Sequence, residues 1–357
     1  MIKPSYLVSA ECALPGRGVS QKKTLSLTQA QNGSNARQKK LLRAVYQKVG
    51  IKTRYSVLNP ARTGDQVAFR DFFLGKGPGT QERMLRFEEY APKLAHVASE
   101  KAIRAAGISS ESVSHLVSVS CTGFAAPGFD ISILKSLSLK PSTSRTQIGF
   151  MGCHGVFNAI RVASGLIQPG QDALVCSVEL CSLHYRHGTD IRKVLGNSLF
   201  SDGAGAAVVS SEKRSPHTWR IAAQSSMIIP DSQDAIMWRV GDFGFEMGLS
   251  QKIRKLIEKN LRAWLEPWLT KENLKLKNIR SWAVHPGGPG VLDAVEKSLG
   301  LSKQALRCSR DVLRSYGNMS SATILFILHQ MMFQEDATPC LALGFGPGLT
   351  IEAALFL

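Results

Sequence analysis

Short apolar runs alternate along this chain with longer segments in which apolar residues recur at helical spacing. Residues 113–120 form a β-branched run and residues 172–178 are a buried-strand candidate, whereas residues 79–107 place apolar side chains near a 3.6-residue period and end at Gly107. Near-continuous apolar strands are typical of sheets that are buried on both faces. Their alternation with helices predicts an α/β fold that is layered around internal sheets.

The pattern starts again after a polar stretch at residues 213–218. Further strands are expected over residues 219–225, 279–284, 340–343 and 349–357, and further helices over residues 131–139, 245–265, 291–299 and 323–331. Both parts of the chain end with a glycine-rich turn and a small-residue strand, DGAGAAVVS in the first and GPGLTIEAALFL in the second. This likeness indicates an internal duplication into residues 1–215 and 216–357.

A cysteine lies where the apolar run at 148–151 gives way to helical spacing. Gly152 and Gly155 flank it and suit a tight turn that has no room for a Cβ atom. Cys153 would then lie at a helix N-terminus, where free N–H groups lower a thiol pKa from about 8.5 toward roughly 3.5–7.5. A thiolate is a nucleophile; the alternative is a buried cysteine that acts as a small apolar residue.

The composition of the chain restricts the class of binding partner more than it restricts the type of reaction. Lysine and arginine number 44 against 27 acidic residues, a net charge of +17, which suits an anionic partner such as a phosphorylated carrier, a nucleic acid or a membrane surface. The seven cysteines lack the spacing of a disulfide framework or of a zinc site. No stretch has the roughly 18 apolar residues of a membrane span or the core of a signal peptide, so we expect a cytoplasmic protein without stable membrane insertion.

Acyl chemistry at a cysteine needs a histidine to pair with the thiolate and a donor for developing negative charge. His154 is a poor partner because neighbouring side chains on a helix do not face each other, and His184 and His187 are expected in a solvated loop. His285 ends an apolar strand before the turn PGGPG, and Asn318 lies in a small-residue turn before an apolar helix. Their alternatives are a structural strand cap and a helix N-cap.

Four segments follow one another along the chain: GCHG around Cys153, VHPGGPGVLDAVEKSLGL around His285, YGNMSSATILFIL around Asn318, and the closing GFGPGLTIEAALF. Together they resemble the type III polyketide synthases, the chalcone synthase-like enzymes, and the likeness spans nearly the whole chain. The bacterial branch, with alkylpyrone and alkylresorcinol synthases, is more similar than the plant branch. The resemblance implies a thiolase-like, duplicated αβαβα fold and a homodimer.

The resemblance also implies roles for particular residues. Cys153 takes the place of the nucleophile, His285 and Asn318 those of its partners, and Phe200 that of a gatekeeping aromatic residue. For the second gatekeeper the register leaves Phe243, Gly244 and Phe245 open, and of these we choose Gly244 because it would leave room for a long chain. Substrate or coenzyme A contacts are further expected at Lys48, Arg43, Ser320, Gly346 and Pro347.

Some positions depart from the family pattern. Lys48 matches a coenzyme A-binding residue of the family, but Leu41 and Ala44 stand where plant enzymes carry basic groups, and Arg43 and Lys40 are the candidate substitutes. His154 also stands where plant members have an aromatic residue.

The implied reaction is an iterative decarboxylative condensation of malonyl-CoA onto an acyl-CoA starter held on Cys153, followed by cyclisation to a pyrone or phenolic product. We expect an aliphatic starter and no metal or other cofactor. The alternatives are a ketoacyl synthase III-like enzyme of fatty-acid synthesis, a papain-like hydrolase and, from charge alone, a nucleic-acid-binding protein; our expectation is that no nucleic acid binds.

Overall fold

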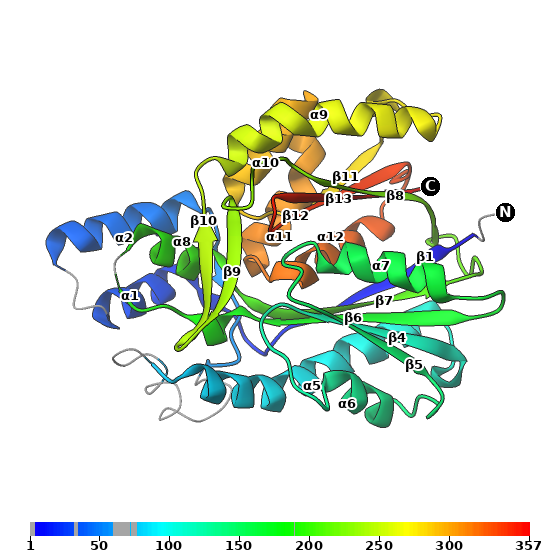
Figure 1. Cartoon of the computed structure of the whole chain (residues 1–357), viewed down its shortest axis with the longest axis horizontal. Coiled ribbons are helices and arrows are strands. Elements are labelled where there is room, and N and C mark those ends of the chain that lie inside the picture. The colour runs from blue at the N-terminus through cyan, green and yellow to red at the C-terminus, as the bar shows by residue number, and fades with distance from the viewer. Residues whose placement is uncertain (1–3, 32–34, 60–71, 73–76, 189) are drawn as a thin grey trace.

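The structure is a computed structural model that describes residues 4–31, 35–59, 72, 77–188 and 190–357. Its helices and strands stack in five layers, with helices outside, two halves of a sheet inside them, and a pair of helices at the centre (Figure 1). The N- and C-terminal ends lie on the same side of this stack. This is the α/β architecture that the apolar pattern predicts.

The strands form one nine-stranded sheet in the order β11-β12-β13-β8-β1-β7-β6-β4-β5. The strands of its first half are β1 (Tyr6–Ala13), β4 (Val113–Ser120), β5 (Ser144–Gly149), β6 (Asp172–Leu180) and β7 (Asp202–Ser210). Those of the second half are β8 (Trp219–Ile228), β11 (Ser281–Val284), β12 (Cys340–Gly346) and β13 (Thr350–Phe356). Only two residue pairs, Tyr6 with Arg220 and Leu7 with Trp219, join the halves through β1 and β8.

Strand pairing repeats between the halves. In the first half β4 and β6 are parallel, β6 and β7 antiparallel, and β7 and β1 antiparallel. In the second half the same sequence of pairings runs through β11, β12, β13 and β8. This repetition is the internal duplication that the two similar strand endings indicate.

The helices fall into three layers and one end group. The outer layers contain α5 (Thr80–Ala106) with α6 (Phe129–Ser136) on one side, and α9 (Ile253–Lys271) with α10 (Pro289–Leu299) on the other. Between the sheet halves lie α7 (Gly155–Leu166) and α12 (Thr323–Met332), with α11 (Arg307–Tyr316) beside α12. At one end lie α1 (Gln21–Gln31), α2 (Ala36–Lys48) and α8 (Ile191–Leu199), with the short β2 (Val19–Ser20) and β3 (Thr53–Arg54) (Figure 1).

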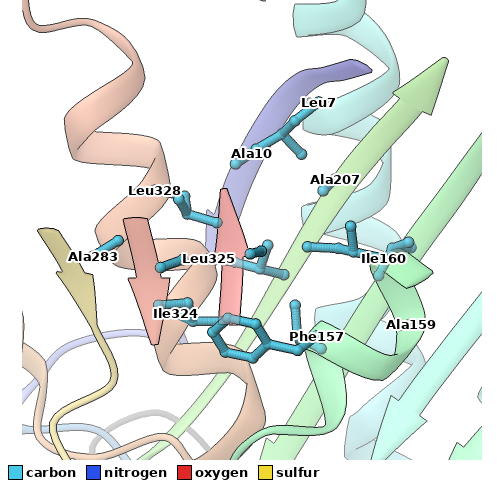
Figure 2. Close-up of a cluster of buried hydrophobic side chains, with 14 of the residues drawn as sticks. Leu7, Ala10, Phe157, Ala159, Ile160, Ala207, Ala283, Ile324, Leu325 and Leu328 are labelled. Carbon is cyan, nitrogen blue, oxygen red and sulfur yellow. The ribbon is translucent and has the colours of Figure 1, made fainter. Parts of the chain in front are cut away.

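The packing of the two central helices explains why the strands that face them contain small residues. Each central helix contacts both sheet halves: α12 packs against β1 and β7 and against β11, and α7 packs against β4 and β6 and, through Phe157, against β12. A Cβ atom at Gly205 would lie 2.8 Å from that of Leu325, and one at Gly344 would collide with Phe157. Figure 2 shows Phe157, Ile160, Ile324 and Leu325 interdigitating in this layer. The glycines therefore permit the close approach that buries both helices.

Most predicted elements are confirmed. The long helix ends at Gly107, whose φ of 65° is the left-handed conformation that favours glycine, and Gly300 ends α10 in the same way. The helix predicted over residues 245–265 is wrong in its first part, because residues 244–249 form β10 (Gly244–Leu249) of a hairpin with β9 (Ile236–Gly241). No helix in the described ranges is long and apolar enough to cross a membrane.

Candidate active site

Cys153 lies in the tight turn between β5 and α7, as the glycine pattern predicts. Gly152 has a φ of 82°, and a Cβ atom there would collide with Pro347. A Cβ atom at Gly155 would lie 2.9 Å from Val119 Cγ1. The absence of a Cβ atom at Gly152 lets this turn pack against Pro347 of the second half, and its absence at Gly155 lets the turn pack against β4 of the first half.

A cavity of about 1230 Å³ begins at this turn and extends toward the end group of helices. Most of the predicted site residues line it, namely Lys48, Cys153, Phe200, Asn318, Ser320, Gly346 and Pro347. Three of them do not: His285, Arg43 and Gly244 are absent from its wall. The cavity wall also includes Trp238 and Phe245 from the β9–β10 hairpin.

The sulfur of Cys153 lies 3.6 Å from the hydroxyl of Ser320. Burial raises the pKa of this thiol to about 12, although the Ser320 hydroxyl acts in the opposite direction. The lowered pKa expected from a helix N-terminus is therefore wrong for this structure, because the desolvation of a thiolate outweighs the donors around it. Cys153 is a neutral thiol at neutral pH until a substrate or a partner changes its surroundings.

His285 follows β11 directly and is completely buried. Its backbone N–H donates to the carbonyl of Leu343 over 2.8 Å, which fixes the residue at the sheet end beside the Gly346 turn. Neither ring nitrogen has a hydrogen-bond partner among the described residues. Burial, with a smaller contribution from the nearby His154, lowers the pKa of His285 to about 3, so the ring is neutral.

Asn318 lies beside Phe200, and the two form a parallel β-bridge across the two halves of the chain. The Asn318 side-chain oxygen accepts a 2.8 Å hydrogen bond from the backbone N–H of Ser320. Its amide nitrogen Nδ2 is buried and has no partner in the described part of the chain. One end of this side chain is thus fixed by the backbone while its N–H donors remain available at the cavity wall.

The hairpin shows how Gly244 and Phe245 are placed relative to the cavity. Gly244 has a φ of 91°, and a Cβ atom there would lie 2.9 Å from Arg83 Cδ and 3.1 Å from His184 Nδ1. A side chain at Gly244 would therefore meet these residues and not the substrate cavity, and the expectation that Gly244 opens the cavity is wrong. Of the three candidate residues Phe245 lines the wall, and it stacks on His184 with ring centroids 4.2 Å apart.

His184 corrects a second expectation, because it is buried and not solvated. Its Nδ1 accepts from the backbone N–H of Phe245 over 2.9 Å, and its Nε2 lies 2.7 Å from the carbonyl oxygen of Thr122. Burial lowers the pKa of His184 to about 3. This ring therefore braces the hairpin, and its partners lie about 60 residues away in sequence, where local pattern gives no sign of them.

Glu179 is a buried residue that sequence reasoning missed. It lies in β6 and accepts hydrogen bonds from the backbone N–H of Cys121 and from the hydroxyls of Thr122 and Ser321. Burial raises its pKa, and its charge in turn contributes to the raised pKa of Cys153. The available signal was an acidic residue near the end of a largely apolar strand, DALVCSVEL, which also begins with Asp172.

Two residues of α2 were expected to contact coenzyme A, and only one of them lines the cavity. Lys48 lines the outer end of the cavity, whereas Arg43 is exposed outside it. His154, next to the nucleophile, is buried against Gly346, where a Cβ atom would collide with its ring. Among the described residues no group of three or more His, Cys, Asp or Glu side chains is placed to hold a metal ion.

Comparison with known proteins adds a family assignment to this geometry. The family model "Chalcone and stilbene synthases, N-terminal domain" matches residues 4–213, and "Chalcone and stilbene synthases, C-terminal domain" matches residues 220–357. The chain is 33% identical over 330 residues to "Alpha-pyrone synthesis polyketide synthase-like Pks18" of Mycobacterium tuberculosis, which covers 89% of this chain and 82% of that protein.

Solved structures of other proteins have the same fold as this chain. The crystal structure of PKS-I from the brown alga Ectocarpus siliculosus superposes with a TM-score of 0.91 at 28% identity, covering 99% of this chain and 98% of that one. The C-terminal type III polyketide synthase domain of Steely1, a type I/III hybrid from Dictyostelium, superposes with a TM-score of 0.90 at 24% identity over 99% of both chains. These likenesses confirm the thiolase-like fold class.

Proposed function

Because the chain belongs to the family of chalcone and stilbene synthases and is a type III polyketide synthase, we propose that Cys153, His285 and Asn318 perform its acyl-transfer and condensation steps. The observation that carries this assignment is the presence of buried side-chain nitrogens without a partner among the described residues: both ring nitrogens of His285 and Nδ2 of Asn318. Buried polar groups are normally hydrogen-bonded, and Asn318 lines the same cavity as Cys153, so an open donor there is suited to a substrate oxygen.

The first step is transfer of the starter. The thiol of Cys153 gives its proton to a ring nitrogen of His285 as the sulfur attacks the thioester carbonyl of an acyl-CoA. The carbonyl then re-forms, the bond to coenzyme A breaks, and the leaving thiolate takes the proton from His285. The product is an acyl group on Cys153 and free coenzyme A.

The second step is extension. Malonyl-CoA loses carbon dioxide and leaves an enolate whose thioester oxygen carries negative charge. Hydrogen bonds from Asn318 Nδ2 and from His285 stabilise this oxygen, and the loss of one such donor commonly lowers the rate by about 10²–10³-fold. The enolate carbon attacks the acyl-Cys153 carbonyl, the bond to sulfur breaks, and the chain leaves Cys153 longer by one ketide unit.

We propose an aliphatic starter and a pyrone as the cyclised product. The cavity wall contains the apolar side chains Leu199, Ile236 and Met237, which suit an alkyl chain. Each buried methylene contributes about 0.8 kcal/mol, so selectivity should rise with chain length until the cavity is filled. The pyrone is proposed because the 33% identical relative from Mycobacterium tuberculosis is named for alpha-pyrone synthesis.

We also propose a homodimer that forms at the edge strand β5. An edge strand presents unpaired backbone groups, and the nearby Phe124 and Met151 are 48% and 41% exposed. A boundary between domains near residue 215 remains a prediction that the repeated strand pairing supports. The cytoplasmic location also remains a prediction.

Mass spectrometry of the intact protein tests the assignment. Wild type is incubated with a panel of aliphatic and aromatic acyl-CoA esters, with and without malonyl-CoA, beside Cys153→Ala. We expect one acyl group per chain, on Cys153 only, with the highest kcat/KM for a medium or long alkyl starter. Acyl label that persists on Cys153→Ala would contradict the nucleophile, and preference for an aromatic ester would contradict the starter.

A further inference from the structure

The strongest concentration of unpaired charge lies outside the catalytic centre, on α1 and α2. Residues 12–64 contain no aspartate or glutamate. Seven cations of α1 and α2 form what we call the cationic face: Lys22, Lys23, Arg37, Lys39, Lys40, Arg43 and Lys48. None of the seven forms an ion pair with another described residue, whereas cations elsewhere often do.

The cationic face adjoins the outer end of the substrate cavity. Lys23 of α1 and Lys48 of α2 belong to both the face and the cavity wall. The opposite side of α2 is fixed, because Leu42 and Tyr46 pack against Val194 of α8. A thioester arm that crosses this face would therefore enter the cavity that ends at Cys153.

Coenzyme A accounts for only part of this face. Of the seven cations, Lys23 and Lys48 line the cavity and the other five do not. The 13 residues of α2 extend over about 20 Å, since each residue of a helix rises about 1.5 Å. A ligand bound at the cavity mouth thus leaves most of the cationic face uncovered.

Apolar side chains are exposed among these charges. Leu41 is 40% exposed on α2, and Ile191, which lines the cavity at the start of α8, is 48% exposed. Exposed apolar groups surrounded by charge are typical of a protein-binding surface. The one aromatic residue of these two helices, Tyr46, is buried, so α1 and α2 lack the stacking platforms of a single-stranded nucleic-acid site.

We propose that the cationic face docks a small acidic carrier protein that presents the acyl starter as a thioester on a phosphopantetheine arm. The proposal rests on the function proposed above, because the acceptor is Cys153. The arm is the same as that of coenzyme A, so the transfer has the same balance: the Cys153 sulfur–carbon bond forms, the carrier thioester breaks, and the carrier thiol leaves with the proton. The enzyme then receives starters from a reaction that builds acyl chains on a carrier.

Reversing charges on the cationic face tests docking of the carrier protein independently of coenzyme A binding. Lys22, Arg37 and Lys39 are exposed and lie outside the cavity wall, so the variant Lys22→Glu/Arg37→Glu/Lys39→Glu changes the face alone. The control Lys271→Glu/Lys275→Glu/Lys277→Glu makes the same charge change at exposed residues at and after the C-terminal end of α9. Loading of Cys153 is measured with a dodecanoyl carrier protein of fatty-acid synthesis and with dodecanoyl-CoA, after thermal unfolding shows that both variants fold.

For wild type we expect loading from both donors, with the carrier reaction falling steeply as salt rises. The face variant should lose about tenfold or more in kcat/KM for the carrier and less than about twofold for dodecanoyl-CoA, because steering by complementary charge acts on the protein partner. The control should keep both rates within about twofold.

Each of the other outcomes would overturn either the docking surface or the proposed function. Wild-type loading from dodecanoyl-CoA but not from the carrier would overturn the docking surface, whereas loading from neither would overturn the proposed function instead. Equal loss in both variants would also overturn the surface, because total charge would then be responsible. Sedimentation with phosphatidylglycerol vesicles, without carrier loading, would make the face a lipid-binding one and overturn the proposal.

Discussion

Two buried polar regions flank Cys153, and they differ in how completely they are satisfied. On one side, Glu179 accepts hydrogen bonds from Cys121, Thr122 and Ser321, so its carboxylate is fully engaged by the protein. On the other side, His285 and Asn318 keep open nitrogen atoms among the described residues. Both regions are equally buried, so burial alone does not explain the difference.

This difference distinguishes residues that stabilise the fold from residues that take part in the reaction. A satisfied buried network stabilises one arrangement of the chain, and its loss is felt as instability. Open buried donors cost stability, by about 1–3 kcal/mol each, and are retained where a substrate satisfies them during the reaction. Variants in the open region should therefore change rates, and variants in the satisfied region should change the free energy of unfolding.

The largest effect is expected at Asn318. Asn318→Ala should slow malonyl-CoA decarboxylation by about 10²–10³-fold while loading of Cys153 changes much less, because the enolate forms only in the first of these reactions. Radiolabelled carbon dioxide release and acyl-enzyme formation measure the two steps separately.

Asn318→Asp is the matched control for this prediction. It keeps the oxygen that accepts from the Ser320 N–H but removes the Nδ2 donor. We expect the same loss of decarboxylation as in Asn318→Ala. If Asn318→Asp decarboxylated at the wild-type rate, Asn318 would be a structural cap only.

A smaller effect, on stability, is expected in the satisfied region. Glu179→Ala should lower the free energy of unfolding by about 2–4 kcal/mol, because the Cys121 N–H would stay buried without an acceptor and a cavity would remain. Urea denaturation measures the change, and Asn318→Asp provides a comparison from the open region. Glu179→Ala with unchanged stability and lost activity would reverse the division drawn between the two regions.

The smallest effect concerns the thiol between the regions. Because burial raises the Cys153 pKa to about 12, the thiolate fraction below that pH grows about tenfold per pH unit. The alkylation rate of free enzyme by iodoacetamide should thus rise about tenfold per unit between pH 7 and 9. A rate that is already constant over that range would show a preformed thiolate–imidazolium pair in the resting enzyme.

The sequence was sufficient for most of the fold because the core is built from regular patterns. The strand predicted at residues 113–120 has those bounds, since the three valines of this segment favour a strand. The error at residues 245–265 has a physical cause: Phe245 and Leu249 precede Ile253, Ile257 and Leu261 at intervals of four, which imitates helical spacing across the turn at Ser250. Periodicity cannot show where one element ends if the next continues its interval.

The site was harder to predict because it depends on contacts between distant residues. The glycine turn at Cys153 was visible locally, and the structure places it against Pro347, about 190 residues later. The pKa of Cys153 and the burial of His184 depend on the whole cavity wall and on desolvation, which no local motif expresses. Gly244 was misjudged for the same reason, since only the hairpin geometry separates it from Phe245.

The β9–β10 hairpin makes the two halves of the duplicated fold differ from each other. It follows β8 in the second half and is held to the first by the Trp238 indole N–H, which donates to the Cys121 carbonyl over 2.7 Å, and by the Arg186–Glu246 ion pair. Trp238 and Phe245 line the cavity but do not pack into the cluster around α7 and α12. A change in this one excursion of the chain can therefore alter the shape of the cavity without altering the repeated frame that holds Cys153.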